Sequence, residues 1–347
     1  MSQKHVIEER SQEIKDSIIY AKRLQSAIMP TIESVERAFK DAFVLYKPKD
    51  IVAGDFYWME TIDVEIDGRK KTLIFFASAD CTGHGVPGAM VSVVCANSLN
   101  RAVKEFKLSD PGLVLDKVSE LVVQSFENSE EDIKDGMDIA LCALDISSKK
   151  LYYSGANNPL YVVTKKQTKS VNKYINEANT HELIEYKATK RPIGKYDKPG
   201  HFETLEVQLV PGDAIYVFSD GFPDQFGGER GKKYKYNKFK KFLLENCTVP
   251  MEEQKQRLDK EFEEWKHSHE QLDDVCVIGV RINGKERNNF TERELEVLSC
   301  LQDGLSSKMI AEKIFISKNT VDTYRRRLLA KTGTNNTTEL LNYCLEK

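Results

Sequence analysis

Five aspartates in this sequence stand next to apolar segments with the composition of buried β-strands. They are Asp55, Asp80, Asp220, Asp273 and Asp274. Carboxylate oxygens are the ligands that hard divalent cations such as Mg²⁺ and Mn²⁺ prefer. Two such ions about 3.5–4 Å apart can activate a bound water and clamp a phosphoryl oxygen. Taken singly, each aspartate could instead cap a helix or stand in a turn, so the chemistry depends on the fold bringing them together.

The segment around Asp80 shows how a strand can position such a carboxylate. Thr72–Ala77 is an apolar run of buried-strand length, and an Ala- and Val-rich helix is predicted at Gly88–Lys107. Asp220 follows a second strand-like run, Ala214–Phe218, in the same way. A carboxylate at the end of a strand is held by the sheet and still reaches solvent, as a metal ligand must.

The composition indicates a soluble, cytoplasmic chain of about two domains. Its 347 residues are 40% apolar and 30% charged, with a net charge of −3, which gives no global signature of polyanion binding. No apolar run approaches the length of about 18 residues that a membrane span needs, and the N-terminus lacks the apolar region of a signal peptide. The seven cysteines are scattered without C-x-x-C spacing, which predicts buried thiols in a reducing compartment.

The predicted elements divide the chain into four segments: residues 1–29, 30–283, 284–289 and 290–347. The first is an amphipathic helix with a weak heptad pattern, which predicts either a surface helix or a short coiled coil joining two protomers. The second has many strands with paired helices and no regular βαβ alternation, which predicts an α+β fold, an αββα layered sandwich. A polar linker then leads to an all-α, four-helix domain.

The last segment has the pattern of a DNA-binding helix-turn-helix. Thr291 and Glu294 form a capping box at the start of an apolar-periodic helix. Ser317 is predicted to cap a later helix, Lys318–Lys331, which follows a short turn and is rich in polar and basic residues. From Ser317 to Lys331 there are five basic residues and one acid, which suits contacts with phosphates. A four-helix protein-interaction module is the alternative.

The aspartate motifs occur in the order of a known enzyme family. The strings Ala53-Gly54-Asp55-Phe56-Tyr57-Trp58, Ala79-Asp80-Cys81-Thr82-Gly83-His84-Gly85, Ser219-Asp220-Gly221 and Asp273-Asp274-Val275 resemble the metal-dependent protein phosphatase (PPM) family, most of all its SpoIIE-like branch. The resemblance implies an αββα sandwich that binds two Mn²⁺ or Mg²⁺ ions and hydrolyses phosphoserine and phosphothreonine in proteins with a metal-activated water. It implies catalytic roles for Asp55, Asp80, Asp220 and Asp273, and metal ligation by Asp55, Asp80, the Cys81 carbonyl, Asp220, Asp273 and Asp274.

This sequence departs from the family pattern at three positions. Cys81 stands where the branch commonly has glycine, so the backbone there must not need a positive φ. His84 lies four residues past Asp80, whereas the wider family has a candidate general acid two residues past it, so we expect His84 to be structural. Asn157 stands where the branch often has histidine.

The motifs Phe290-Thr291-Glu292-Arg293-Glu294, Ser317-Lys318-Asn319-Thr320-Val321 and Lys331-Thr332-Gly333 closely resemble the LuxR/GerE-type helix-turn-helix. By position, the resemblance implies that DNA is contacted by Lys318, Asn319, Thr320, Thr323, Tyr324, Arg325, Arg326 and Arg327. The family's fourth helix commonly dimerises, and Leu340, Leu341 and Cys344 would offer an apolar face for a homodimer.

Together these patterns predict a Mn²⁺- or Mg²⁺-dependent serine/threonine phosphoprotein phosphatase coupled to a DNA-binding domain in bacterial signalling. The implied partners are a phosphorylated protein, such as a STAS-type anti-anti-sigma protein, double-stranded DNA and a second copy of the chain, with no membrane. The alternative is a transcription regulator whose phosphatase-like domain is only a sensory or dimerisation module. Degenerate phosphatase domains usually lose metal-binding aspartates, and all the matched ones are present here, which favours an active enzyme.

Overall fold

The computed structural model describes residues 3–66, 68–127, 134–166, 173–175, 180–197, 200–282, 291–332 and 334–345. The chain divides into two compact units, Met1–Asn283 and Gly284–Lys347. The predicted linker at 284–289 lies outside the described residues. Of the helices that are described, none is long and apolar enough to cross a membrane.

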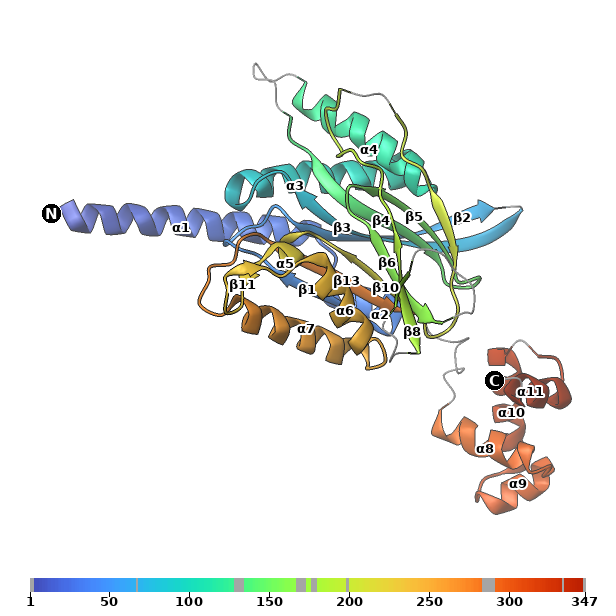
Figure 1. Cartoon of the computed structure of the whole chain (residues 1–347). Coiled ribbons are helices and arrows are strands. Elements are labelled where there is room, and N and C mark those ends of the chain that lie inside the picture. Colours follow the sequence, from blue (N-terminus) through green and yellow to red (C-terminus); the bar gives the residue numbers. More distant parts are fainter. Residues whose placement is uncertain are drawn as a thin grey trace. The chain divides into compact units, whose positions relative to one another are not determined.

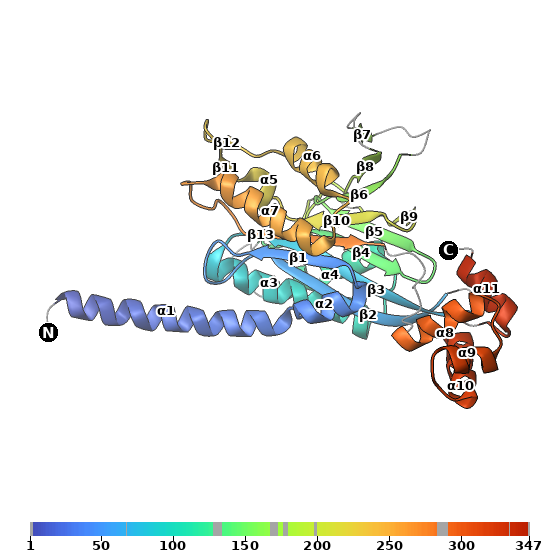
Figure 2. The same cartoon turned by 90° about the horizontal axis from the view of Figure 1, so that it is seen from below.

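Two antiparallel sheets form the centre of the first unit (Figures 1 and 2). Within the described residues, one sheet has the strand order β1-β13-β10-β6-β8-β7 and the other has the order β2-β3-β4-β5-β9. The strands of the first sheet are β1 Ala42–Lys47, β13 Val275–Arg281, β10 Ala214–Phe218, β6 Leu160–Lys165, β8 His181–Tyr186 and β7 Lys173–Ile175. Those of the second are β2 Phe56–Ile66, β3 Arg69–Cys81, β4 Met137–Asp145, β5 Lys150–Ala156 and β9 Leu205–Gln208.

Helices cover the outer faces of both sheets, which confirms the predicted αββα sandwich. Helices α3 (Gly85–Asn100) and α4 (Pro111–Phe126) pack on the sheet that contains β3. Helices α6 (Tyr236–Asn246) and α7 (Met251–Lys266) pack on the sheet that contains β10. The remaining elements of this unit are α1 Gln3–Ile28, α2 Ile32–Phe39, a π-helical turn at Arg101–Glu105, α5 Gly221–Asp224 and the small hairpin of β11 Phe226–Gly227 and β12 Lys232–Lys233.

The central strands are buried on both faces, which explains their continuous apolar runs. On β3, Phe75 faces the helices and Phe76 faces the opposite sheet. On β10, Val217 faces the opposite sheet and Phe218 faces α6 and α7. Because successive strand residues point to opposite faces, a strand between two apolar layers needs an apolar residue at every position.

Helix α2 and strand β7 are among the elements that the sequence patterns did not predict. Helix α2 is short, and it forms because Val35 and Phe39 pack into the core between the sheets. Strand β7 lies within the polar, Lys- and Asn-rich stretch 165–180, where it pairs with β8. In both cases contacts with distant residues outweigh weak local preferences.

The second unit is a helical domain of α8 Glu292–Gln302, α9 Ser307–Lys313, α10 Lys318–Thr332 and α11 Thr337–Leu345. The predicted capping box is present: Thr291 Oγ1 accepts from the Glu294 amide, and the Glu294 carboxylate accepts from the Thr291 amide. The buried core consists of Val297, Leu298, Cys300, Leu301, Ile310, Val321, Leu328 and Leu340.

The predicted dimerisation face on α11 is partly wrong. Leu340 is 1% exposed in the core of its own domain, and Leu341 packs against the same core. These two side chains are therefore used within one chain. The side chain of Cys344 lies outside the described residues.

Candidate metal centre and nucleic-acid interface

Three neighbouring strands bring carboxylates to one end of a sheet. The register of β2 and β3 pairs Phe56 with Ala79, so Asp55, just before β2, comes opposite Asp80. The register of β3 and β4 pairs Asp80 with Asp138. The residues next to these aspartates face α3 and α4, so the three carboxylates face the other sheet.

The other sheet supplies the remaining predicted carboxylates. Asp220 follows the end of β10, and Asp273 and Asp274 precede the start of its antiparallel neighbour β13. Asp80, Asp220 and Asp273 line one pocket, together with Asp138 and the turn after Asp80. The structure thus brings aspartates from both sheets into one site between them.

Burial and mutual repulsion disfavour the charged forms of these carboxyl groups. Burial, and then the charges of Asp55, Asp220 and Asp273, raises the pKa of Asp80 to about 10. Burial, and then Asp224 and Asp273, raises the pKa of Asp220 to about 6. Burial also raises the pKa of Asp55 well above its usual range. A cation in the pocket would offset this repulsion.

The side chain of Asp55 fits a metal ligand particularly well. It is 2% exposed, and among the described residues its Oδ2 atom has no hydrogen-bond partner. A buried carboxylate oxygen without a partner is costly, and a hard cation would satisfy it. No three His, Cys, Asp or Glu side chains of the described chain already stand close enough to hold a metal ion. The negative charges of these carboxylates repel one another when no cation lies between them. Support for a metal therefore comes from the type of donor atoms present, and not from side chains that already surround an ion.

Asp274 has a different position from the other aspartates. Its Oδ1 accepts a hydrogen bond from the Lys49 amide at 2.7 Å, and its Oδ2 accepts from the Gly54 amide at 2.7 Å and the Asp55 amide at 3.4 Å. Both oxygens are therefore engaged with the backbone of the loop that carries Asp55. This geometry favours a positioning role for Asp274 over the metal ligation implied by the resemblance.

The backbone around Cys81 tolerates a residue with a side chain. Cys81 ends β3 opposite Met137 and is not one of the described residues with a positive φ. The left-handed backbone falls instead on Gly83, with a φ of 81°. A Cβ on Gly54 would lie 2.2 Å from the Gly83 carbonyl oxygen, so glycine at position 54 lets the loop before Asp55 approach this turn.

His84 is held at the rim of the pocket by its neighbours. Its Nδ1 lies 2.9 Å from Asp50 Oδ2, and its Nε2 lies 3.2 Å from Lys49 Nζ. These contacts agree with the structural role expected from its position, four residues past Asp80.

Sequence reasoning missed two residues of the pocket, Asp138 and Lys134. The Asn157 side chain donates to Asp138 Oδ1 at 2.8 Å, so the residue that departs from the branch pattern contacts a pocket carboxylate. Lys134 is exposed, and among the described lysines and arginines it is the one that lines the pocket. Only the strand register, which places Asp138 opposite Asp80, would have revealed this carboxylate.

A buried glutamine connects α1 to the Asp55 loop. Gln25 is 4% exposed, and among the described residues of α1 it is the one that is buried. Its Nε2 donates to the Ala53 carbonyl at 2.5 Å and to Ser92 Oγ at 2.9 Å, and its Oε1 accepts from the Ala53 amide at 3.2 Å. One side chain thus joins α1, the segment before Asp55 and helix α3, which follows the Asp80 turn.

Replacing Gln25 with alanine is expected to lower both stability and turnover. The change leaves the buried polar groups of Ala53 without partners, which costs about 1–3 kcal/mol in the free energy of unfolding, and it loosens the segment that carries Asp55. Urea unfolding and Mn²⁺-dependent hydrolysis of a phosphopeptide measure the two effects. Gln12→Ala, on the exposed part of α1, is the control. Equal behaviour of the two variants would contradict the positioning role.

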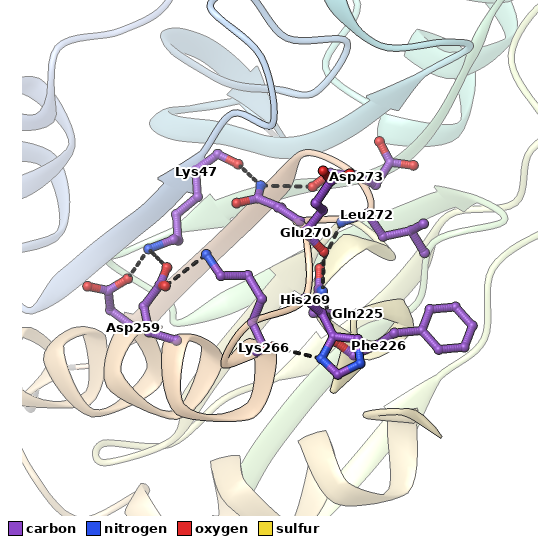
Figure 3. Close-up of polar contacts among 11 residues, drawn as sticks. Lys47, Gln225, Phe226, Asp259, Lys266, His269, Glu270, Leu272 and Asp273 are labelled. Atoms are coloured by element: carbon purple, nitrogen blue, oxygen red, sulfur yellow. Dashed lines mark hydrogen bonds and ion pairs between the residues drawn. The ribbon is translucent and has the colours of Figure 1, made fainter. Parts of the chain in front are cut away.

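Two further glutamines hold the segment that carries Asp273 (Figure 3). Gln225 is 0% exposed; its Nε2 donates to the Glu270 carbonyl at 2.9 Å and its Oε1 accepts from the Leu272 amide at 2.9 Å. Gln271 donates to the carbonyls of Lys47 and Asp273. An amide can bond to backbone donors and acceptors at once, and it adds no charge to an already acidic site.

In the second unit, α10 presents most of the predicted DNA-contacting residues. Lys318, Asn319, Arg326 and Arg327 are exposed, and Thr320, Thr323 and Tyr324 are half-buried. Ser317 caps the helix as predicted, because its hydroxyl accepts from the Thr320 amide at 3.1 Å. A capped, basic helix after a short turn has the form of a recognition helix.

Arg325 is the exception among the three consecutive arginines. Its Nη1 donates to Ser307 Oγ at 2.6 Å and its Nη2 donates to Thr337 Oγ1 at 2.7 Å. Its guanidinium therefore joins α10 to α9 and α11, and this geometry favours a role inside the domain over the predicted contact with DNA.

Comparison with known families agrees with this architecture. The family model described as Stage II sporulation protein E (SpoIIE) matches residues 70–283, which is more than half of the 347 residues, so the chain belongs to the SpoIIE family. The model described as bacterial regulatory proteins, luxR family, matches residues 288–344. The chain thus contains a SpoIIE-type phosphatase domain of the PPM class followed by a LuxR/GerE-type helix-turn-helix domain.

Individual relatives resemble each part separately. The structure of the SiaA-PP2C domain of Pseudomonas aeruginosa is similar to this chain with a TM-score of 0.64 and 28% sequence identity, over 78% of this chain and 98% of that domain. The oxygen regulatory protein NreC of Staphylococcus aureus (strain JH9) is 39% identical over 58 residues, or 17% of this chain and 27% of NreC. The match therefore spans about a quarter of the length of that curated relative.

Proposed function

We propose that the chain is a Mn²⁺- or Mg²⁺-dependent serine/threonine phosphoprotein phosphatase with a DNA-binding domain. The observation that carries the proposal is the carboxylate pocket between the sheets, with the partnerless Oδ2 atom of buried Asp55 beside it. An acidic site of this kind would repel a phosphate group unless cations neutralised it. A phosphatase domain of this family therefore has both the need for metal ions and the oxygen donors to hold them.

In this proposal the side chains of Asp55, Asp80, Asp220 and Asp273 and the carbonyl of Cys81 hold two ions. When bound, such ions lower the pKa of a bound water and bind phosphoryl oxygens. Asp80 lies between Asp55 and Asp138 in the sheet, so its carboxylate would be available to an ion beside either neighbour. Asp274 positions the Asp55 loop through the three amides that it accepts.

The direct test is hydrolysis of a phosphoserine peptide by the full-length protein with and without Mn²⁺ or Mg²⁺. We expect turnover that requires the metal and disappears with a chelator. No metal-dependent turnover of any phosphopeptide would leave the alternative, a regulator whose phosphatase-like domain only senses or dimerises. The resemblance to the SpoIIE-like branch makes a phosphorylated STAS-type protein the first natural substrate to try.

Lys134 is proposed to bind the phosphate group of the substrate, because it is a cation that lines the acidic pocket. Lys134→Ala is expected to raise the KM for a phosphopeptide about tenfold, the effect of losing one charge-assisted contact of roughly 1.5 kcal/mol. Lys134→Arg should retain most of the affinity, and Lys260→Ala, on the exposed side of α7, serves as the control. An unchanged KM in Lys134→Ala would exclude this contact.

The second domain is proposed to bind double-stranded DNA through α10. Arg326 and Arg327 are exposed, so replacing both with alanine should remove two phosphate contacts. The slope of the logarithm of the DNA-binding constant against the logarithm of the salt concentration should then become shallower by about two. Fluorescence anisotropy with a DNA duplex over a salt series measures this slope. Arg325→Ala should instead destabilise the domain by about 1–3 kcal/mol, because Arg325 bonds to α9 and α11.

Arg293→Ala, on α8, controls for the loss of charge. A salt slope that is unchanged in the Arg326/Arg327 double variant would contradict the assignment of α10 as the DNA-binding helix. A homodimer remains part of the proposal, and sedimentation of the full-length protein tests it separately.

A further inference from the structure

The segment from Arg230 to Lys241 is strongly basic in a chain whose net charge is −3. It carries seven basic residues and no acidic one: Arg230, Lys232, Lys233, Lys235, Lys238, Lys240 and Lys241. The segment runs through strand β12 and the first half of helix α6. Its charge is therefore a local feature of one part of the phosphatase domain.

Four of these side chains already have acidic partners. Lys233 pairs with Asp224 at 2.7 Å, and Lys238 pairs with Glu261 at 2.9 Å. The other two pairs are Lys240 with Glu185 at 2.9 Å and Lys241 with Glu245 at 3.7 Å. These ion pairs fix the segment to its surroundings and leave three residues to consider.

We call the three remaining side chains, Arg230, Lys232 and Lys235, the basic rim. All three are exposed, and no acidic side chain in the described part of the chain pairs with them within 4.0 Å. No ion pair of the described chain therefore depends on the charge of these three side chains. Glu229, which directly precedes Arg230, is exposed, and no ion pair within 4.0 Å joins it to the described rim residues. Unpaired positive charges on a surface are a means of attracting an acidic partner.

The basic rim is attached to the segment that carries Asp220. The Lys235 amide donates to the Pro223 carbonyl at 2.6 Å, and the Tyr234 amide donates to the Gln225 carbonyl at 2.9 Å. Pro223 belongs to α5, which begins directly after Asp220, and Figure 1 shows α5 next to β11 at one end of the sandwich. The backbone thus ties Lys235 directly, and Arg230 and Lys232 through the same hairpin, to the segment that follows Asp220.

Two other cations near the pocket, Lys47 and Lys49, are already engaged. Lys47 bonds to Asp259 at 2.5 Å and to Glu263 at 2.7 Å, as Figure 3 shows for its contact with Asp259. Lys49 contacts His84, which in turn contacts Asp50. The basic rim therefore adds unpaired positive charge to that of Lys134 in the pocket and of exposed Lys190, whose charge acts on Asp138.

We propose that Arg230, Lys232 and Lys235 form a docking surface for acidic residues that flank the phosphorylated serine or threonine of the substrate. The proposal rests on the phosphatase function and names a substrate class for it: phosphoproteins with acidic sequence around the phosphate. The metal-binding pocket would handle the phosphate group, and the basic rim would select its sequence context. Such contacts lie in water, so they act mainly on association and on KM and weaken with salt.

The test compares two phosphoserine peptides of equal length, one flanked by Asp and Glu and one flanked by Ser and Gly. The full-length wild type should have a kcat/KM about tenfold higher for the acidic peptide at low salt, as expected for three exposed charge contacts, and high salt should reduce this preference. The variant Arg230→Gln/Lys232→Gln/Lys235→Gln should treat the two peptides nearly alike. Hydrolysis of p-nitrophenyl phosphate reports whether the metal centre of each variant is intact.

The matched control is Lys15→Gln/Lys22→Gln/Arg23→Gln, which changes the net charge equally on exposed residues of α1. An equal loss of preference in this control, or no preference in the wild type, would overturn the proposal. Loss of DNA binding in the basic-rim variant with the peptide preference intact would overturn it in favour of a nucleic-acid surface.

Anisotropy of a fluorescent acidic phosphopeptide measures docking without turnover. If the wild type fails to hydrolyse p-nitrophenyl phosphate and yet binds the acidic peptide through the basic rim, the phosphatase function fails and the docking surface stands. If it hydrolyses p-nitrophenyl phosphate but the rim variant binds the acidic peptide as tightly as the wild type, the docking surface fails and the phosphatase function stands.

Discussion

The Asp80→Asn variant is expected to lose Mn²⁺-dependent phosphatase activity by about 10³-fold or more in kcat. Asparagine keeps the shape of the side chain and removes its negative charge from the centre of the carboxylate cluster. Burial and four neighbouring aspartates hold the pKa of Asp80 at about 10, so its charge is unfavourable unless a cation is bound. The metal-free variant should therefore be at least as stable as the metal-free wild type.

Thermal unfolding with and without Mn²⁺ separates loss of the metal site from loss of the fold. A ligand that binds only the folded state raises its stability with concentration, so Mn²⁺ should stabilise the wild type and have little effect on Asp80→Asn. Asp63→Asn, on the exposed part of β2, should behave as the wild type. Activity of Asp80→Asn within tenfold of the wild type would exclude Asp80 as a metal ligand.

The Gly221→Ala variant is expected to lose about 10²-fold in kcat/KM. A Cβ at this position would lie 1.9 Å from the Asp274 carbonyl oxygen, a distance that real atoms do not tolerate. The segment with Asp273 and Asp274 must then move relative to Asp220, and a displacement of about 1 Å in a catalytic site can cost a factor of this size. The overpacking should also lower the free energy of unfolding by about 1–3 kcal/mol.

Gly200→Ala is the control, because the nearest atom to its added Cβ is an Arg191 nitrogen at 3.5 Å, an ordinary van der Waals contact. Both variants should be assayed at saturating Mn²⁺ and at a temperature where circular dichroism shows them folded. Full activity of folded Gly221→Ala would show that the two segments can shift without disturbing the site.

The sequence patterns predicted the location of most site carboxylates because each follows or precedes an apolar run. Such a run has a strong preference for a buried strand, and its ends are marked by polar residues. Asp80 and Asp220 lie at such ends, and the fold places both in one pocket. Their roles as metal ligands stay a prediction.

The residues that sequence reasoning missed depend on contacts between distant segments. Asp138 joins the site only because the strand register puts it opposite Asp80, and a shift of one residue would turn it to the other face. Gln25 has the polarity of an exposed helix position, yet it is buried because it bonds to Ala53. Arg325 differs from its two neighbours only in its direction around α10, since each helical residue is rotated by about 100° from the last.

The three amide contacts of Asp274 also determine when the site can form as the chain folds. They join residues 225, 220 and 219 positions apart in the sequence. Closing a loop of this length costs chain entropy before any contact repays it. The Asp55 loop therefore reaches its final position only after β13, the last strand of the sandwich, has been made and has docked. A chain still lacking β13 on the ribosome would lack this arrangement of carboxylates, so the proposed activity is expected only of the completed domain.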